Sequence, residues 1–554
     1  MERRQLPALR TQTMKQYGNI VVSPEHGALV VNITAPQLVA ESRSWPVLVR
    51  REQANGVLLM LPWDEQSCRI LFNCGYQEAL ECTPFMHTAV PLIEGKYNPL
   101  RHQALTSSFM TLYNRSYVLS EPRLGKTGST VLAFDYLQRR RKFQGAVCII
   151  TTYTTIQSVW ADAFTSTLPN IRVQIVHGPT RQEDLRKPAD VYITNYDSVR
   201  LELPAFLRAL DTGFIGAVVV DELTHVGNSE AQRSKAICKM CQHPNARYVV
   251  GLTGSPADNP DAVFGMAKCI NPGKLPCRTK GGWQRAIYSW WGGEAWQKSL
   301  LSTAYKTIRD TLMPAVRYKK ADALDLPPVT EQVRECPLSK EQERAIKELK
   351  NEALTMLDSG ETITAANGGV LIQRVLQVAL GIIKDAAGNA IMLPHKERTQ
   401  AMLDAIAETP NKTVVFSPYV AGCTMLAEEF RKAGYTAEVI TGNVNGTKRT
   451  EILRAFQQEK DPHILVCHPI TVGFGTELSA ADTMIFAVPL LLGGFVYNQA
   501  LERLSSVKQK ASNINIIHII GCQAEKKVLQ HLKDGYSEGK IIASLFEDLT
   551  ANLL

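Results

Sequence analysis

The residues of this chain best suited to chemistry lie in the run Ser120-Glu121-Pro122-Arg123-Leu124-Gly125-Lys126-Thr127. A turn-rich loop of this kind, followed by a helical pattern, can ring a phosphate with backbone N–H groups. Lys126 would place its charge on the β and γ oxygens, and Thr127 would offer a hydroxyl to Mg²⁺. Ser120 stands where such loops usually have glycine, and Pro122 removes one N–H donor. The loop alone therefore leaves open a basic surface turn that only spells Gly-Lys-Thr.

A pair of carboxylates further along the chain fits the same chemistry. Residues 217–220 form an apolar strand that ends in Asp221 and Glu222. If the loop holds a nucleotide, Asp221 would coordinate Mg²⁺ through water and Glu222 would polarise the attacking water. The alternative is a solvated acid pair at the end of a strand. The loop upstream favours the catalytic interpretation.

The elements that must position these residues alternate strand, loop and helix from about residue 96 onward, which is typical of parallel α/β layers. The first strands are apolar throughout, so we expect them to be buried on both faces. They are predicted at 146–152, 191–196, 217–220 and 248–252. A second series is predicted at 413–416, 437–441, 463–467, 483–488 and 514–520.

The pattern predicts an α/β protein with two lobes beside a small α+β domain. Short β-like runs and a helix at 63–75 make up the predicted N-terminal accessory domain, 1–95. The predicted domains that follow are a first lobe at 96–332 with an insertion from about 271, a second lobe at 333–535 with a helical insertion, and a helical tail at 536–554. Four tryptophans fall in the first insertion, and core aromatics are favoured over stacking platforms for nucleic acid: Trp283, Trp290, Trp291 and Trp296.

Composition bounds the possible partners. A chain of 554 residues is expected to form roughly two to four domains. Its net charge of +8 permits contact with a polyanion without requiring it. The sequence shows neither a signal peptide nor a stretch near the roughly 18 apolar residues of a membrane span, so we expect no membrane partner and a cytoplasmic or nuclear location. The 12 cysteines fit reduced thiols, and the Cys238-Lys239-Met240-Cys241 run favours a helix over a zinc site.

The order of these signals resembles the helicase-like ATPases of superfamily two, most closely the Swi/Snf-type DNA translocases. The resemblance runs from about residue 97 to residue 530. In the first lobe it is carried by the loop and by Leu100-Arg101-His102-Gln103, Ile149-Ile150-Thr151-Thr152 with Trp160, Ile193-Thr194-Asn195-Tyr196, Asp221-Glu222-Leu223-Thr224 with Asn228, and Leu252-Thr253-Gly254-Ser255-Pro256. In the second lobe it is carried by Val414-Val415-Phe416-Ser417, Thr471-Val472-Gly473-Phe474-Gly475, and Gln499-Ala500-Leu501-Glu502-Arg503 with Gln509.

The resemblance implies two tandem RecA-like lobes that bind and hydrolyse ATP with Mg²⁺. It implies catalytic roles for Lys126, Glu222, Gln499 and Arg503, with Arg503 completing the site from the second lobe when the cleft closes. It implies that the nucleotide is bound by Gln103, Gly125, Lys126, Thr127, Asp221 and Gly475, with Thr127 and Asp221 serving the metal. It also implies coupling by Thr253 and Ser255, and DNA phosphate contacts by Thr151, Thr194, Ser417 and Thr471.

The resemblance implies a DNA-stimulated motor that moves on duplex or forked DNA without reading its sequence and remodels or anneals it. The last motif has Ser506 in place of a second arginine and Lys508 in place of a glycine. The acidic motif has Thr224 in place of a histidine, although His225 is adjacent. These departures, with Ser120, leave open a nucleotide-gated clamp with weak turnover, and a strand-separating helicase is a third alternative. The compact insertions favour a bacterial or phage protein. The unit at 1–95 weakly resembles the substrate-recognition units of annealing helicases.

Overall fold

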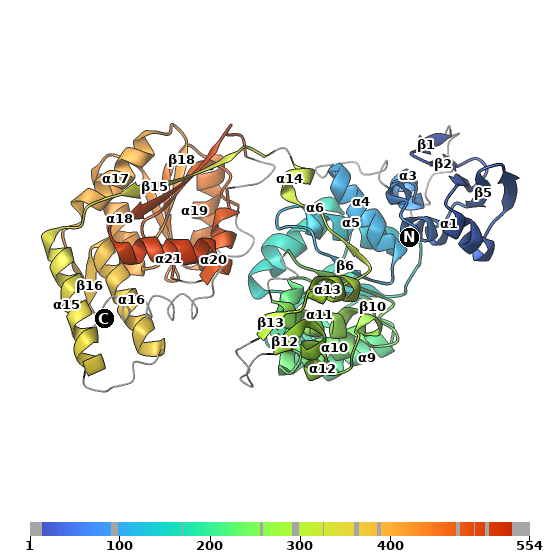
Figure 1. Ribbon diagram of the computed structural model, residues 1–554, viewed down its shortest axis with the longest axis horizontal. Coiled ribbons are helices and arrows are strands. Elements are labelled where there is room, and N and C mark those ends of the chain that lie inside the picture. The colour runs from blue at the N-terminus through green and yellow to red at the C-terminus, as the bar shows by residue number, and fades with distance from the viewer. Residues whose placement is uncertain are drawn as a thin grey trace. The chain divides into compact units, whose positions relative to one another are not determined.

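The computed structural model divides into two compact units, residues 1–323 and 324–554, and each is described by itself (Figure 1). Strands and helices are given as they occur in the part of the chain that the structure describes. That part comprises residues 14–89, 98–168, 170–254, 259–290, 298–324, 326–358, 365–384, 389–471, 477–491, 493–504 and 509–534.

The first unit begins with a five-stranded antiparallel sheet in the order β1-β2-β3-β5-β4. Its strands are β1 (Lys15–Tyr17), β2 (Ile20–Ser23), β3 (Ala28–Ile33), β4 (Val49–Gln53) and β5 (Gly56–Pro62). Buried residues alternate with half-buried ones along β5, because successive side chains of a strand point to opposite faces. The predicted helix at 63–75 is confirmed as α2 (Glu65–Asn73), which begins where Asp64 accepts a hydrogen bond from Ser67 N at 2.7 Å.

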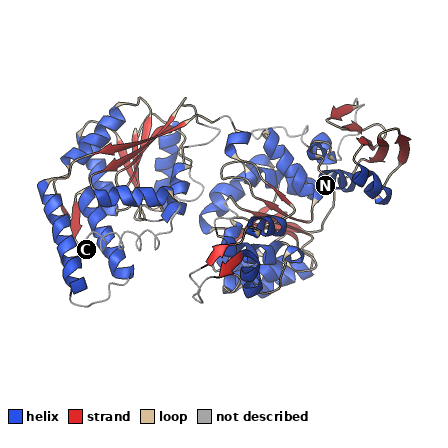
Figure 2. Cartoon of the chain, viewed as in Figure 1, coloured by secondary structure: helices blue, strands red, loops and turns tan. Residues whose placement is uncertain are grey.

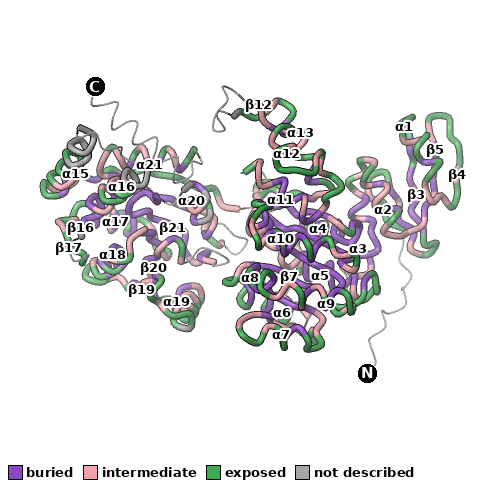
Figure 3. Tube along the Cα trace, turned by 90° about the horizontal axis from the view of Figure 1, so that it is seen from below, coloured by how far each residue is buried: buried purple, intermediate pink, exposed green. Residues whose placement is uncertain are grey.

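A seven-stranded parallel sheet follows, in the order β14-β6-β11-β10-β7-β9-β8. Its strands are β6 (Arg115–Val118), β7 (Ala146–Thr151), β8 (Val173–Val176), β9 (Val191–Asn195), β10 (Ile215–Val220), β11 (Tyr248–Leu252) and β14 (Ala315–Val316). Every residue of β7, β10 and β11 is buried, as the apolar strands predict. Successive residues along these strands belong alternately to two hydrophobic clusters, one on each face of the sheet. Figure 3 shows the buried stretches of the chain in purple.

Helices cover both faces of this sheet (Figure 2). Those of the first unit are α1 (Pro36–Glu41), α3 (Pro84–Thr88), α4 (Arg101–Leu112), α5 (Lys126–Arg139), α6 (Asp162–Thr167), α7 (Arg181–Asp184), α8 (Tyr196–Leu201), α9 (Leu203–Asp211), α10 (Gln232–Cys241) and α11 (Pro260–Ile270). Since the strands are parallel, their carboxyl ends and the loops that follow lie at one edge. The loop before Lys126, the Asp221 turn and Thr253 all lie at that edge.

The insertion after α11 belongs to the first unit, and the chain that follows it rejoins the seven-stranded sheet through β14. It contains α12 (Lys280–Ile287), the hairpin of β12 (Tyr288–Trp290) and β13 (Lys298–Leu300), and α13 (Ala304–Thr311), and leads into β14 and α14 (Lys320–Ala323). Trp283 is fully buried and donates from Nε1 to the Pro260 carbonyl at 3.0 Å, which confirms it as a core aromatic. Only the backbone of Trp290 is described, and Trp291 and Trp296 lie outside the described residues.

The second unit is built on a six-stranded parallel sheet in the order β15-β22-β21-β18-β20-β19. Its strands are β15 (Val329–Glu335), β18 (Lys412–Phe416), β19 (Ala437–Ile440), β20 (Ile464–Cys467), β21 (Ala481–Phe486) and β22 (Ile514–Ile520), with a small hairpin of β16 (Ile382–Lys384) and β17 (Ala390–Met392). The expected boundary at 332/333 falls inside β15, which pairs with β22. The second unit therefore begins earlier than the sequence pattern predicts.

The helices of the second unit include the predicted helical insertion. They are α15 (Lys340–Asp358), α16 (Ala365–Leu380), α17 (Lys396–Ala407), α18 (Val420–Lys432), α19 (Gly446–Gln458), α20 (Gly493–Leu501) and α21 (Gln523–Lys533). The predicted tail at 536–554 lies outside the described residues. None of the described helices combines the length and apolar character that a membrane span requires.

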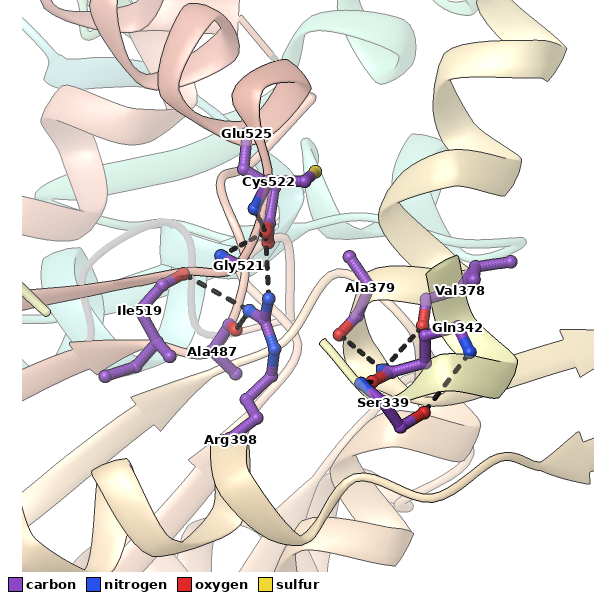
Figure 4. A network of polar contacts seen from close by, with 10 residues as sticks. All are labelled: Ser339, Gln342, Val378, Ala379, Arg398, Ala487, Ile519, Gly521, Cys522 and Glu525. Carbon is purple, nitrogen blue, oxygen red and sulfur yellow. Dashed lines mark hydrogen bonds and ion pairs between the residues drawn. The ribbon is translucent and has the colours of Figure 1, made fainter. Parts of the chain in front are cut away.

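One buried ion pair ties α17 to α21 in the second unit (Figure 4). Arg398 Nη2 lies 2.8 Å from Glu525 Oε2, and the two side chains are 2 % and 0 % exposed. Arg398 Nη1 and Glu525 Oε2 also meet backbone groups at the ends of β21 and β22, whereas Arg398 Nε and Glu525 Oε1 are buried without a hydrogen-bond partner among the described residues. Arg398 Nη1 donates to the carbonyls of Ala487 at 2.6 Å and Ile519 at 3.2 Å. The Glu525 carboxylate accepts from the backbone N–H groups of Gly521 at 2.6 Å and Cys522 at 3.1 Å.

A candidate nucleotide site at one edge of the first parallel sheet

The predicted phosphate loop joins β6 to α5. Its backbone enters the left-handed region at Arg123 (φ 65°) and Gly125 (φ 76°). These two residues turn the chain back before Lys126 begins α5. The Lys126 ammonium donates to the carbonyls of Ser120 at 2.9 Å and Glu121 at 3.1 Å. The Lys126 side chain therefore folds back over the loop that is predicted to bind phosphate.

Gln103, which the resemblance implies binds the nucleotide, lies directly against this loop. A Cβ atom on Gly125 would fall 2.2 Å from Gln103 Nε2, so only glycine fits at this close approach. Gln103 Oε1 accepts a hydrogen bond from Leu100 N at 3.0 Å. The neighbouring His102 ring holds the loop from the same helix, with Nε2 3.1 Å from the Leu124 carbonyl. Burial lowers the pKa of His102, so this ring is neutral at neutral pH.

The segment after β11 packs on the other side of the loop. Thr253 N donates to the Val118 carbonyl at 3.1 Å. A Cβ atom on Gly254 would lie 2.7 Å from Pro122 Cδ. Pro122 thus contacts the Leu252-Thr253-Gly254 segment. The proline lacks an N–H donor, but its ring packs against this segment. Ser255 lies outside the described residues.

The Asp221 carboxylate is held by three donors at the carboxyl end of β10. Its Oδ2 accepts from Thr151 Oγ1 at 2.9 Å and from Trp160 Nε1 at 2.8 Å. Its Oδ1 accepts from Glu222 N at 3.1 Å. The Thr151 and Trp160 donors come from the end of β7 and from the helical turn Ile156–Ala161. An aspartate fixed in this way presents a defined carboxylate rather than a mobile surface acid.

Tyr196 clamps the turn that carries the acidic pair. Its hydroxyl donates to the backbone carbonyls of Asp221 and Glu222, the latter at 3.1 Å. Glu222 adopts a left-handed backbone (φ 52°), which is uncommon for a residue other than glycine and is held here by these contacts. Burial and the nearby carboxylates raise the pKa of Tyr196, so its hydroxyl remains a donor. The centroid of the Tyr196 ring lies 5.2 Å from the centroid of the His225 ring and 5.6 Å from Cζ of the Arg233 guanidinium.

The four hydroxyls predicted to contact DNA are hydrogen-bonded within the protein. Thr151, Thr194 and Ser417 are fully buried. Thr194 Oγ1 donates to the Val176 carbonyl at 2.9 Å, and Thr471 Oγ1 donates to the His468 carbonyl at 2.7 Å. DNA contact by these four residues stays a prediction.

Sequence reasoning missed the most exposed aromatic residue of this edge. Tyr153 follows β7 by two positions, is 66 % exposed and lies 4.8 Å from the His177 ring. A solvent-exposed ring beside a nucleotide site is the signal that identifies it, and exposure is not readable from a run of threonines.

The second unit carries the remaining predicted residues. Arg503 follows α20 and is 8 % exposed, and its carbonyl accepts from Leu478 N at 3.1 Å. Gln509 Nε2 donates to the Ala481 carbonyl at 2.8 Å, which anchors the end of the same segment. For Gln499 only the backbone, on α20, is described. Gly475 and Ser506 lie outside the described residues.

Two protein-family models match the chain in tandem. The SNF2-related domain matches residues 55–381, and the helicase conserved C-terminal domain matches residues 397–531. The junction between the two matches lies inside the second unit, because the first model extends through α16.

Individual relatives are distant. The SWI/SNF chromatin-remodeling complex subunit snf22 of Schizosaccharomyces pombe is 23 % identical over 415 residues, which cover 68 % of this chain and 24 % of that protein. Protein p41 of Acyrthosiphon pisum secondary endosymbiont phage 1 is 24 % identical over 448 residues, which cover 76 % of this chain and 93 % of p41. The mouse DNA annealing helicase and endonuclease ZRANB3 is 23 % identical over 425 residues, or 73 % of this chain and 37 % of that protein.

The chain thus spans about a quarter of the length of the yeast relative and nearly all of the phage protein. Among solved structures, the Sulfolobus solfataricus SWI2/SNF2 ATPase core in complex with dsDNA is 18 % identical, with a TM-score of 0.38 over 79 % of this chain and 91 % of that one. The SNF2-related domain alone covers more than half of the chain, and the helicase C-terminal domain follows it. The chain therefore belongs to the SNF2-related family, the Swi/Snf-type helicase-like ATPases of superfamily two.

Proposed function

We propose that this ATPase is stimulated by DNA and moves on duplex or forked DNA without reading its sequence, remodelling or annealing the strands that it meets. The observation that carries the proposal is the convergence of two sites at one edge of the first sheet. The loop of Lys126 lies against Gln103 and Gly254. The Asp221 and Glu222 turn follows β10 at the same edge, with its aspartate fixed by Thr151 and Trp160.

The residues present suit a nucleotide triphosphate with Mg²⁺. Gly125 leaves room for Gln103 and for close approach to the loop, where any other residue would clash. The Thr127 hydroxyl and the Asp221 carboxylate are the oxygen ligands that Mg²⁺ prefers, and the ion would neutralise phosphate charge. Lys126 would exchange its two loop carbonyls for phosphate oxygens when nucleotide binds.

The chain's own residues then divide the work of hydrolysis. Lys126 holds and neutralises the β and γ oxygens, and Glu222 orients the attacking water. Arg503 supplies a further positive charge from the second unit. Because only one arginine of the usual pair is in the sequence, turnover depends strongly on this single guanidinium.

Contact with DNA would rely mainly on phosphates, so binding is expected to be independent of sequence and sensitive to salt. The net charge of +8 is consistent with such a partner. The similarity of this chain to the mouse DNA annealing helicase and endonuclease ZRANB3 supports DNA as the partner. Tyr153 offers an exposed ring for a sugar or a base at the same edge.

Displacement of a triplex-forming strand from duplex DNA tests movement directly. We expect ATP-dependent release of the third strand, with no release by Glu222→Gln at the same protein concentration. Duplex unwinding of a blunt substrate is expected to be weak. Release of the third strand without ATP, or failure to release it while ATP is hydrolysed, contradicts translocation on duplex.

A nucleotide-gated clamp is the second candidate, favoured by Ser506 in place of the second arginine. Such a protein would bind DNA in one nucleotide state and turn over slowly. It predicts ATP-dependent DNA retention with little phosphate release.

A further inference from the structure

A carboxylate in the second unit gathers three donors on a single oxygen. Glu331 Oε1 lies 2.9 Å from His518 Nε2, 3.2 Å from the Tyr497 hydroxyl and 2.8 Å from Lys533 Nζ. The four residues come from β15, β22, α20 and α21. The hydrogen bond from His518 is the largest cause, with Lys533, that lowers the pKa of Glu331 to about 2. Glu331 is therefore ionised at every pH at which the protein is handled, and it is a strong acceptor.

The protonation state of His518 follows from its surroundings. Burial lowers its pKa, although Glu331 opposes that effect, so the ring is neutral at neutral pH. Nε2 then carries the proton that it donates to Glu331, and the Tyr497 hydroxyl donates to the same carboxylate oxygen. His518 also stacks on Phe486 of β21, with centroids 4.9 Å apart and planes 6° from parallel. The ring is thus fixed by both a hydrogen bond and a stacked neighbour.

The Glu331 cluster lies between β15 and the helix that precedes Arg503. β15 lies at the edge of the sheet and, among the described strands, pairs only with β22. It begins at Val329, five positions after Leu324, the first residue of the second unit. Tyr497, 2 % exposed, lies on α20, which ends at Leu501, two positions before Arg503. The Glu331 carboxylate therefore links β15, the first strand of the second unit, with α20, the helix that precedes Arg503.

We infer that Glu331 and Tyr497 are positioning residues for Arg503. The Tyr497 hydroxyl, held on Glu331, fixes α20 on the sheet and so sets where Arg503 emerges. Neither residue is required to touch nucleotide. The inference rests on the proposed role of Arg503 in hydrolysis, and it adds a route by which the connecting strand can influence that role.

Tyr497→Phe removes the hydroxyl and keeps the ring packed against Phe486 at 5.3 Å. Loss of one hydrogen bond to a charged acceptor is expected to lower kcat for ATP hydrolysis by about five- to tenfold. KM for ATP is expected to change less than about twofold, because most of the residues that are proposed to hold ATP lie in the first unit. Glu331→Leu should lower kcat at least as much, and Glu331→Gln, which keeps an acceptor oxygen, should restore most of it.

Tyr435→Phe is the matched control. Tyr435 stacks on His463 in the same unit, with centroids 5.6 Å apart, so it is another tyrosine and histidine pair. Its loss of a hydroxyl is expected to leave kcat unchanged. Thermal unfolding of each variant reports whether the fold is retained, and Tyr497→Phe carries the test if Glu331→Leu does not fold.

A double-mutant cycle with Arg503→Ala decides the question. If the cluster acts through Arg503, Tyr497→Phe lowers kcat in the wild-type background and has no further effect beside Arg503→Ala. Equal losses in both backgrounds, or no loss in the wild-type background, overturn the inference while the role of Arg503 stands. If Arg503→Ala itself leaves kcat unchanged, the proposed role of Arg503 falls, and this inference falls with it.

Discussion

Glu222→Gln is expected to lower the steady-state rate of ATP hydrolysis by about 10³-fold, because it removes the carboxylate that we propose orients and polarises the attacking water. The substitution keeps the size of the side chain and leaves the backbone contacts of the turn in place. Tyr196 holds that turn through the Asp221 and Glu222 carbonyls, so the left-handed backbone is retained. ATP binding should persist, since Lys126 and Gln103 are untouched. Phosphate release at saturating ATP measures the effect.

The control for this prediction is Glu230→Gln. Glu230 lies a few residues beyond the acidic turn, is exposed and pairs with Lys235 at 3.4 Å. Its substitution removes the same charge from the same part of the chain and should leave turnover within about twofold, as expected for a surface ion pair. Turnover by Glu222→Gln at a similar level would mean that another group activates water.

Arg398→Met is expected to destabilise the second unit by about 3–5 kcal/mol, because it leaves the Glu525 carboxylate buried and without its cation. The arginine occupies a site with no spare room, as a Cβ atom on Gly521 would lie 2.7 Å from Nη2. Urea unfolding followed by a probe in the second unit measures the loss. Arg398→Met combined with Glu525→Gln should recover part of the stability, since the uncompensated charge is then removed.

Arg334→Met supplies the comparison for that experiment. Arg334 also pairs with a glutamate, Glu408, but the glutamate side chain is 60 % exposed. Water already screens this pair, so its removal should cost less than about 1 kcal/mol. If the two arginine variants lost equal stability, burial would not be the cause of the Arg398 effect.

The sequence could predict features that consist of consecutive residues. The Gly125-Lys126-Thr127 loop and the Asp221-Glu222 turn are each a single continuous stretch, and the strands or helices beside each stretch determine its placement. Four strands of the seven-stranded sheet and five of the six-stranded sheet were predicted for the same reason. β15 escaped prediction as part of the second sheet because its sequence is Val-Thr-Glu-Gln-Val-Arg-Glu and nearly all of it is exposed at the sheet edge.

The contacts between distant segments could not be predicted. Thr151 and Asp221 are 70 positions apart, and Glu331 and His518 are 187 positions apart. Only strand order places such residues together, and no local pattern encodes it. For this reason the hydrogen bond from Thr151 Oγ1 to the Asp221 carboxylate could not be predicted from the strand-end run that contains the threonine.

The central claim, a DNA-stimulated ATPase, is tested most directly by phosphate release at saturating ATP with and without duplex DNA. The measurement is made at low salt, where phosphate contacts are strongest. The account predicts stimulation of about tenfold or more, because the proposed mechanism requires bound DNA to promote the contribution of the Arg503 charge to hydrolysis. A rate that duplex DNA leaves unchanged, although the protein binds that DNA, contradicts the account and leaves the clamp as the function.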